Sequence, residues 1–195
     1  YANHVSRNYA STIWQFTDDA RKQHLLVCEF HTKANALNGD AMKILEEAVN
    51  RLDSDDYQGL IVYNEAMNFS AGADLNTMIE LADQSNWKGI DKYLSHFQQV
   101  CKKMKYTSKP TISAVAGLAI GGGFEVACQT SRMVAHMNST LGLVETGVGL
   151  VPGGGGCKEL LWRWVQDPEY TKDLQQFQMQ MQNRSLLILI KFCHL

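Results

Sequence analysis

Apolar residues follow two spacings along this chain, and the change from one spacing to the other separates predicted strands from predicted helices. Compact apolar runs favour buried strands over 24–30, 59–63, 111–115 and 133–135. Apolar residues three or four positions apart predict helices from Asn38 or Asp40 to Leu52, and over 75–81, 87–106, 122–129 and 157–165. Strands that alternate with helices in this way indicate an α/β fold.

The two ends of the chain fit this pattern less well. Residues 1–20 mix polar and apolar positions, with Trp14 and Phe16 as the expected buried anchors. The segment 170–182 is compatible with a helix, and 186–190 is strongly apolar for a chain end. We therefore expect a core domain over 1–165 and a helical tail over 166–195. The tail either packs on another subunit or stops before the elements that would cover it.

Composition narrows the class of protein. The net charge of −2 gives no general attraction for nucleic acid or for an anionic membrane, and no apolar run is long enough for a membrane span. Five cysteines, an odd number with no CxxC pair, favour reduced thiols in the cytoplasm or the mitochondrial matrix. The chain begins at Tyr1 rather than at Met, so we expect it to be a piece of a longer protein.

Glycines gather in one window, where 11 of the 15 lie between Gly117 and Gly156. Three consecutive glycines end at Gly123, and Glu125 follows among apolar neighbours. Glycine lets a ligand approach the backbone closely because it has no Cβ. A carboxylate in apolar company beside such a backbone predicts a catalytic site in this window.

Nucleotide binding is the obvious alternative for glycine-rich loops, and the spacing argues against it. A P-loop requires Lys and then Ser or Thr after the glycines, whereas Gly156 is followed by Cys-Lys-Glu. A dinucleotide fingerprint requires GxGxxG, but the third glycine is replaced by Pro152 in 147–152. The glycines therefore predict close approach to a different kind of ligand.

A second glutamate, Glu145, also lies among apolar and glycine residues. Two carboxylates in one apolar pocket can hold different protonation states, and so supply a general acid and a general base at neutral pH. The alternative is that Glu125 and Glu145 cap helices or pair with surface cations. His31 and His136 are weaker acid–base candidates because no partner lies beside either in the sequence.

The loop 69–74 (Phe-Ser-Ala-Gly-Ala-Asp) forms a second junction of small residues before a helix. Backbone N–H groups from two such helix starts can converge on one oxygen atom and form an oxyanion hole. The simpler interpretation is a turn in which Asp74 caps the following helix.

Five motifs together resemble the enoyl-CoA hydratase/isomerase (crotonase) superfamily from about Leu25 to Trp164. The motifs that carry the resemblance are 33–37 (KANAL), 69–74 (FSAGAD), 109–117 (KPTISAVAG), 119–125 (AIGGGFE), and a fifth made of 143–145 (LVE) together with 151–156 (VPGGGG). The segment 142–156 further resembles the hydratase part of multifunctional 3-hydroxyacyl-CoA dehydrogenases. The resemblance implies a crotonase-like ββα spiral whose C-terminal trimerisation helices are incomplete in this chain.

The resemblance also implies roles for individual residues. The N–H groups of Ala73 and Gly122 would hold the thioester oxygen, and Glu125 and Glu145 would hold the attacking water. Residues expected to contact the coenzyme A substrate are Lys33, Ala34, Ala36, Ala71, Asp74 and Leu75, although a lone lysine is often simply solvated. The aromatic and methionine side chains over 87–104 are expected to belong to the core.

The function expected from this resemblance is hydration of trans-2-enoyl-CoA to 3-hydroxyacyl-CoA in fatty-acid β-oxidation. No metal or redox cofactor is expected, since coenzyme A is part of the substrate. The family forms trimers or hexamers, so we expect a homo-oligomer or a part of a larger polypeptide. The alternatives are a Δ3,Δ2-enoyl-CoA isomerase and a silent acyl-CoA-binding module.

Overall fold

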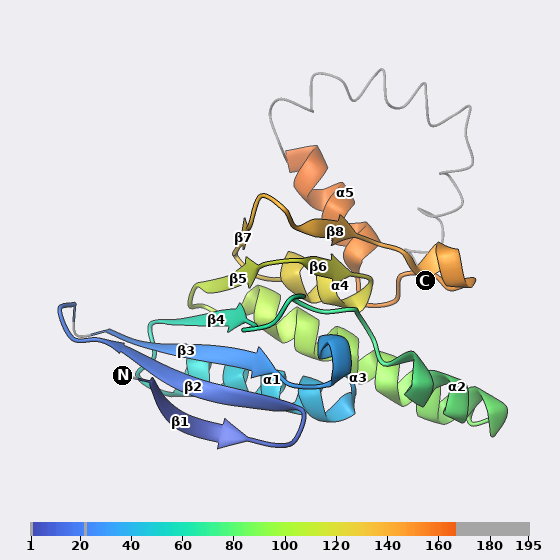
Figure 1. Ribbon diagram of the computed structural model, residues 1–195, viewed down its shortest axis with the longest axis horizontal. Helices are drawn as coiled ribbons and strands as arrows, with labels where there is room; N and C mark the ends of the chain where they lie inside the picture. Colours follow the sequence, from blue (N-terminus) through green and yellow to red (C-terminus); the bar gives the residue numbers. More distant parts are fainter. Residues whose placement is uncertain (1, 22, 167–195) are drawn as a thin grey trace.

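The computed structural model describes residues 2–21 and 23–166 (Figure 1). In this part of the chain a six-stranded sheet has the order β1-β2-β3-β4-β5-β7. Its strands are β1 (Ala2–Arg7), β2 (Ser11–Asp18), β3 (Gln23–Phe30), β4 (Gly59–Tyr63), β5 (Thr111–Val115) and β7 (Arg132–Ala135). The first two pairs are antiparallel and the pairs from β3 to β7 are parallel.

The remaining elements connect and cover this sheet. A parallel pair of three-residue strands, β6 (Leu118–Ile120) and β8 (Thr140–Gly142), forms a second small sheet. The helices are α1 (Gly39–Ser54), α2 (Leu75–Asp83), α3 (Trp87–Tyr106), α4 (Gly122–Cys128) and α5 (Gly156–Gln166), with short 3-10 helices η1 (Lys33–Asn35) and η2 (Glu145–Val148). The predicted α/β class and the helix and strand order are confirmed.

Two parts of the fold were not predicted from the sequence. Residues 2–7 and 11–18 form the antiparallel strands β1 and β2, which their mixed pattern did not reveal. No element was predicted around residue 141, but β8 lies there and pairs with β6. The tail expected over 166–195 lies, apart from Gln166, outside the described residues.

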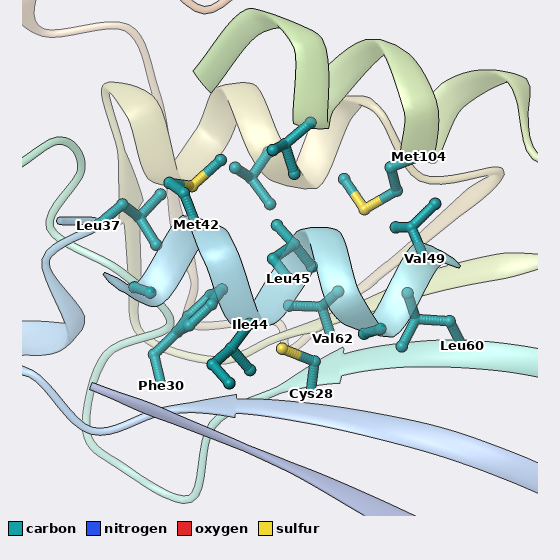
Figure 2. Close-up of a cluster of buried hydrophobic side chains, with 14 of the residues drawn as sticks. Cys28, Phe30, Leu37, Met42, Ile44, Leu45, Val49, Leu60, Val62 and Met104 are labelled. Atoms are coloured by element: carbon teal, nitrogen blue, oxygen red, sulfur yellow. The ribbon is translucent and has the colours of Figure 1, made fainter. Parts of the chain in front are cut away.

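The core lies between the sheet and the two long helices α1 and α3 (Figure 2). Leu45 and Val49 on α1 face Cys28 and Val62 on the strands, and Met104 closes the cluster from α3. All five side chains are at most 1% exposed, and Cys28 and Val62 on the strands are fully buried. Burial of this apolar face is the main stabilising contribution to the fold.

Polar side chains define where the helices begin. The Asn38 side chain accepts a hydrogen bond from the Ala41 N–H, so Asn38 rather than Asp40 caps α1. Asp74 caps α2 in the same way, through the Asn76 N–H. The carboxyl ends of the parallel strands lead into the loops that precede these helices. Ligand sites in such sheets lie at this edge.

Candidate active site

The proposed catalytic residues all line one cavity of about 370 Å³. Glu125, Glu145, Ala73 and Gly122 contribute to its wall. The rest of the lining is mainly apolar, and includes Ala71, Leu75, Met78, Tyr93, Leu94, Phe97, Ile120, Val144, Val148, Leu150 and Val151. An apolar cavity with a few converging polar groups is the usual form of a small-molecule site.

The N–H groups of Ala73 and Gly122 lie side by side at this cavity. A Cβ placed on Gly122 would be 3.0 Å from the Ala73 nitrogen, and one on Gly72 would be 3.2 Å from the Gly122 nitrogen. Within the described part of the chain neither N–H group donates a hydrogen bond. Two adjacent, unoccupied donors can bind a single oxygen atom that gains negative charge.

Close packing of two loops brings these donors together. Ser70 forms an isolated parallel bridge with Ala119, through hydrogen bonds from the Ser70 N–H to Leu118 and from the Ile120 N–H to Ser70. A Cβ on Gly123 would lie 2.6 Å from the Ser70 Cβ, so only glycine allows this approach. The glycine stretch therefore serves contact between loops as well as access for a ligand.

Glu125 is buried, with an exposed fraction of 3%. Its Oε1 accepts hydrogen bonds from the N–H groups of Gly154, at 2.8 Å, and Gly156, at 2.9 Å. Burial raises the pKa of this carboxyl group and the neighbouring Glu145 raises it further, while the glycine N–H groups lower the pKa in part. The second glycine run, over 153–156, thus holds Glu125, a contact that the sequence pattern did not predict.

Glu145 is the first residue of η2 and lines the same cavity as Glu125. A Cβ on Gly121 would lie 3.3 Å from the Glu145 Oε1, which places this carboxylate at the entrance to α4. Its Oε2 atom is buried and has no hydrogen-bond partner in the described part of the protein. A buried carboxylate oxygen without a hydrogen-bond partner destabilises the protein unless a ligand or a water molecule donates a hydrogen bond to it.

Of the six predicted substrate contacts, Ala71 and Leu75 line the cavity, and the other four lie outside its lining. Lys33 and Ala34 are exposed and Ala36 is half-buried, all within or beside η1. The Ala71 N–H donates to the Ala34 carbonyl at 3.0 Å, which joins this loop to the cavity wall. Asp74 accepts hydrogen bonds from Asn76 and from the Thr77 hydroxyl as a helix cap.

Helix α3 contributes a wall of the cavity that sequence reasoning assigned to the core. Tyr93, Leu94 and Phe97 line the cavity, while Val100 and Met104 are buried in the core as expected. The helical period gives the buried face of α3, but it cannot tell core from cavity wall. The two histidine candidates are both exposed at the surface, where His31 contacts Thr12.

Other kinds of site find little support among the described residues. No helix in that part of the chain is long and apolar enough to cross a membrane. No group of three or more His, Cys, Asp or Glu side chains there is arranged to hold a metal ion. Cys28, Cys101 and Cys128 are buried thiols that form no disulfide, and burial raises the pKa of each.

Solved structures with the same fold are numerous. Pseudomonas aeruginosa DspI aligns with a TM-score of 0.71 at 26% identity, over 86% of this chain and 61% of that one. An enoyl-CoA hydratase structure from Geobacillus kaustophilus aligns with a TM-score of 0.71 at 21% identity, over 90% of this chain and 62% of that one. These alignments identify the fold as that of crotonase.

Sequence relatives include a probable 3-hydroxyacyl-CoA dehydrogenase of Bacillus subtilis, 33% identical over 80% of this chain and 19% of that protein. A protein of Rickettsia felis named as a fatty acid oxidation complex trifunctional enzyme is 38% identical over 68% of this chain and 18% of its own length. The chain thus spans about a fifth of these relatives. The family model for enoyl-CoA hydratase/isomerase matches residues 20–166. The chain belongs to the enoyl-CoA hydratase/isomerase family.

Proposed function

We propose that this domain adds water to the double bond of a trans-2-enoyl-CoA and yields the 3-hydroxyacyl-CoA. One observation carries this proposal: two glutamates and two adjacent N–H donors line the same apolar cavity. Family membership supports a coenzyme A thioester as the substrate. The relatives named for 3-hydroxyacyl-CoA dehydrogenase and fatty acid oxidation support a place in fatty-acid β-oxidation.

The N–H groups of Ala73 and Gly122 would bind the thioester oxygen. Addition of water at C3 moves electron density through C2 onto this oxygen, and the two donors stabilise the enolate that forms. The apolar lining strengthens these hydrogen bonds because it excludes water from around them. The chemistry neither oxidises nor reduces the thioester, so we propose no redox cofactor and no metal.

A water molecule between Glu125 and Glu145 would be the nucleophile. One carboxylate takes a proton from this water as its oxygen attacks C3, and C2 receives a proton from the other. The raised pKa of Glu125 and the unpartnered Oε2 of Glu145 support such a division between two protonation states. Gly154 and Gly156 would keep Glu125 in one orientation throughout.

The test is the pair of variants Glu125→Gln and Glu145→Gln, assayed for hydration of a 2-enoyl-CoA. Each variant should lower kcat by about 10³-fold or more while the affinity for the thioester is retained, because Gln keeps the shape and loses the proton transfer. Near-native hydration by either variant would remove that glutamate from the mechanism. Tight binding without turnover in the unmodified protein would instead favour a silent acyl-CoA-binding module.

Isomerisation of a 3-enoyl-CoA is the second candidate, and the orphaned Oε2 of Glu145 favours it. A single carboxylate can move a proton between C2 and C4 without any water. Isomerase activity should therefore be retained in Glu125→Gln and lost in Glu145→Gln, whereas hydratase activity requires both residues. Assays of both variants with 2-enoyl and 3-enoyl substrates separate these activities.

The setting of the reaction is also a proposal. We infer that the domain works as part of a larger polypeptide, or as a trimer or hexamer, in the cytoplasm or the mitochondrial matrix. Relatives about four times as long as this chain support a place in a larger polypeptide. A mouse relative named as a mitochondrial methylglutaconyl-CoA hydratase supports the mitochondrial matrix. Size-exclusion chromatography with light scattering would measure the oligomer.

A further inference from the structure

The hydroxyl group of Tyr93 donates a hydrogen bond of 2.5 Å to the Leu37 carbonyl. Tyr93 lies on α3 and lines the cavity, while Leu37 follows η1 and is fully buried. The contact joins parts of the chain that are 56 residues apart. The mechanism proposed above does not use this hydroxyl group.

Leu37 is in turn paired with the backbone around Ala73. The two residues form an isolated parallel bridge. The Leu37 N–H donates to the Gly72 carbonyl at 2.8 Å, and the Asp74 N–H donates to the Leu37 carbonyl at 3.2 Å. Both peptide groups that flank Ala73 are therefore held by Leu37.

The first of these bonds fixes the direction of the Ala73 N–H. The Gly72 carbonyl and the Ala73 N–H belong to the same peptide group, which is planar, with the oxygen and the hydrogen on opposite sides. A hydrogen bond that holds the oxygen therefore sets where the hydrogen points. In this case it points away from Leu37, on the side of the peptide opposite the bridge.

We propose that Tyr93 is a positioning residue for the Ala73 N–H, acting through the backbone of Leu37. This inference rests on the proposed role of Ala73 as a donor to the thioester oxygen. The Leu37 carbonyl accepts from both Tyr93 and Asp74, so α3 anchors the bridge at the point where it meets the cavity. Small errors in the direction of such a donor weaken its bond to a developing oxyanion.

The chemistry of Tyr93 suits a fixed donor rather than an acid or base. Burial raises the pKa of its hydroxyl group to about 12, so the group keeps its proton throughout the neutral range. That proton is already used by the Leu37 carbonyl. Phenylalanine at this position would fill the same space in the cavity wall, so Tyr93→Phe isolates the hydrogen bond.

The experiment compares Tyr93→Phe with the unmodified protein, using an aryl-conjugated enoyl-CoA whose absorbance moves to longer wavelength when its carbonyl group is polarised. We expect a smaller spectral shift on binding, a fall in kcat for 2-enoyl-CoA hydration of about tenfold, and a KM within about twofold. The matched control is Tyr106→Phe, on the same helix, where the side chain is 67% exposed. It should change neither the shift nor the rate.

A bound-state spectrum and kcat that both equal those of the unmodified protein would overturn the proposal. A fall in kcat with an unchanged spectral shift would also overturn it, since Tyr93 would then act elsewhere. The spectral shift requires binding but no turnover, so it is independent of hydration. An unmodified protein that polarises the probe without hydrating any enoyl-CoA would refute the proposed function and leave the role of Tyr93 standing.

Discussion

The two walls of the cavity differ in how they are held. One wall is formed by α3, α4 and the loop before α2. It carries Glu125, Gly122 and Ala73, and all seven residues of α4 are buried. Glu145 belongs to a wall formed by η2 and the following segment, where no residue of η2 is buried. Exposed apolar side chains on that side, continuing onto α5, are Val144, Val148, Leu150, Val151, Leu160, Leu161, Trp162 and Val165.

This difference separates two requirements of one site. Donors that stabilise charge work best when they are already in place, and α4 supplies one of the two, the Gly122 N–H, from a fully buried helix. Binding elements that must admit a substrate are commonly drawn from less stable parts of a protein. The wall that carries Glu145 has few buried contacts among the described residues, so we expect it to be the more readily displaced of the two.

The largest expected effect is on stability, and it compares the buried core under α1 with the exposed face of α5. Leu45 is fully buried on α1, and Leu45→Ala should lower the free energy of unfolding by about 4 kcal/mol through lost burial and a cavity. Leu161→Ala on α5, where the side chain is 38% exposed, should change it by less than about 1 kcal/mol. Urea denaturation measures both. A large loss for Leu161→Ala would mean that this face is covered in solution.

The next effect concerns the ion pair that joins α5 to α3. The Lys105 Nζ lies 2.6 Å from the Glu159 Oε1, and the Glu159 side chain is only 3% exposed. Lys105→Met leaves a buried carboxylate and should destabilise the fold by about 3 kcal/mol. Lys158→Met is the control, because the Lys158 side chain is 57% exposed although it also contacts Glu159. An equal loss of unfolding free energy in the two variants would show that the more buried Lys105 contact contributes no more stability than the exposed Lys158 contact.

Burial alone would raise the pKa of Glu159, but the bonds from Lys105 and Lys158 lower it below the ordinary glutamate value. The stability from this ion pair is therefore present above the ordinary pKa and is lost as the pH falls through the lowered value. The difference in stability between the unmodified protein and Lys105→Met should accordingly shrink in acid.

A change at the junction of the two walls should reduce activity more than stability. A Cβ on Gly154 would lie 2.5 Å from the Phe97 Cε1 and 2.6 Å from the Glu125 Oε2. Gly154→Ala should therefore displace Glu125 and lower kcat by about 10²-fold. Gly147→Ala in η2 has no atom within 4 Å of the new Cβ and should leave kcat unchanged. Equal activity in the two variants would contradict the role given to the glycine run.

The smallest effect is the pH dependence contributed by Glu125. Its pKa is raised chiefly by burial, so the folded state binds its proton more tightly than the unfolded state does. Stability from this group is full below the ordinary glutamate pKa and falls as the pH rises through the raised value. Glu125→Gln should thus gain stability relative to the unmodified protein as the pH rises from about 4 to about 8. An unchanged difference between these pH values would refute the raised pKa.

Sequence patterns predicted the parallel strands and the long helices because each has its own period. The run 59–63 forms β4 with unchanged bounds, and α3 covers the expected 87–106. The strands β6 and β8 have three residues each, which is too short for a period of apolar residues to be recognised. They are defined only by their hydrogen-bonded pairing with each other. In β2, tryptophan and phenylalanine alternate with polar residues, and the segment forms a strand because it pairs antiparallel with β1 and β3.

The site was predicted in a similar, uneven way. Glycines and small residues marked where backbone comes close, and the structure brings Ala73 and Gly122 together as the family resemblance implied. The partners of Glu125 could not be predicted, since Gly154 and Gly156 lie about 30 residues away and act through backbone groups that all residues share. The hydroxyl group of Tyr93 was hidden for the same reason, because its acceptor is a carbonyl group.

The bridge between Leu37 and Ala73 joins a loop expected to contact coenzyme A to the proposed oxyanion hole. The loop 33–37 is expected to line the groove for the adenine and pantetheine of coenzyme A, and Leu37 is hydrogen-bonded to the peptide that would meet the thioester. Binding energy from the remote part of a substrate can be used to improve alignment at the reacting centre. A short pantetheine thioester without the nucleotide should therefore react more slowly even when it saturates the site, and not merely bind more weakly.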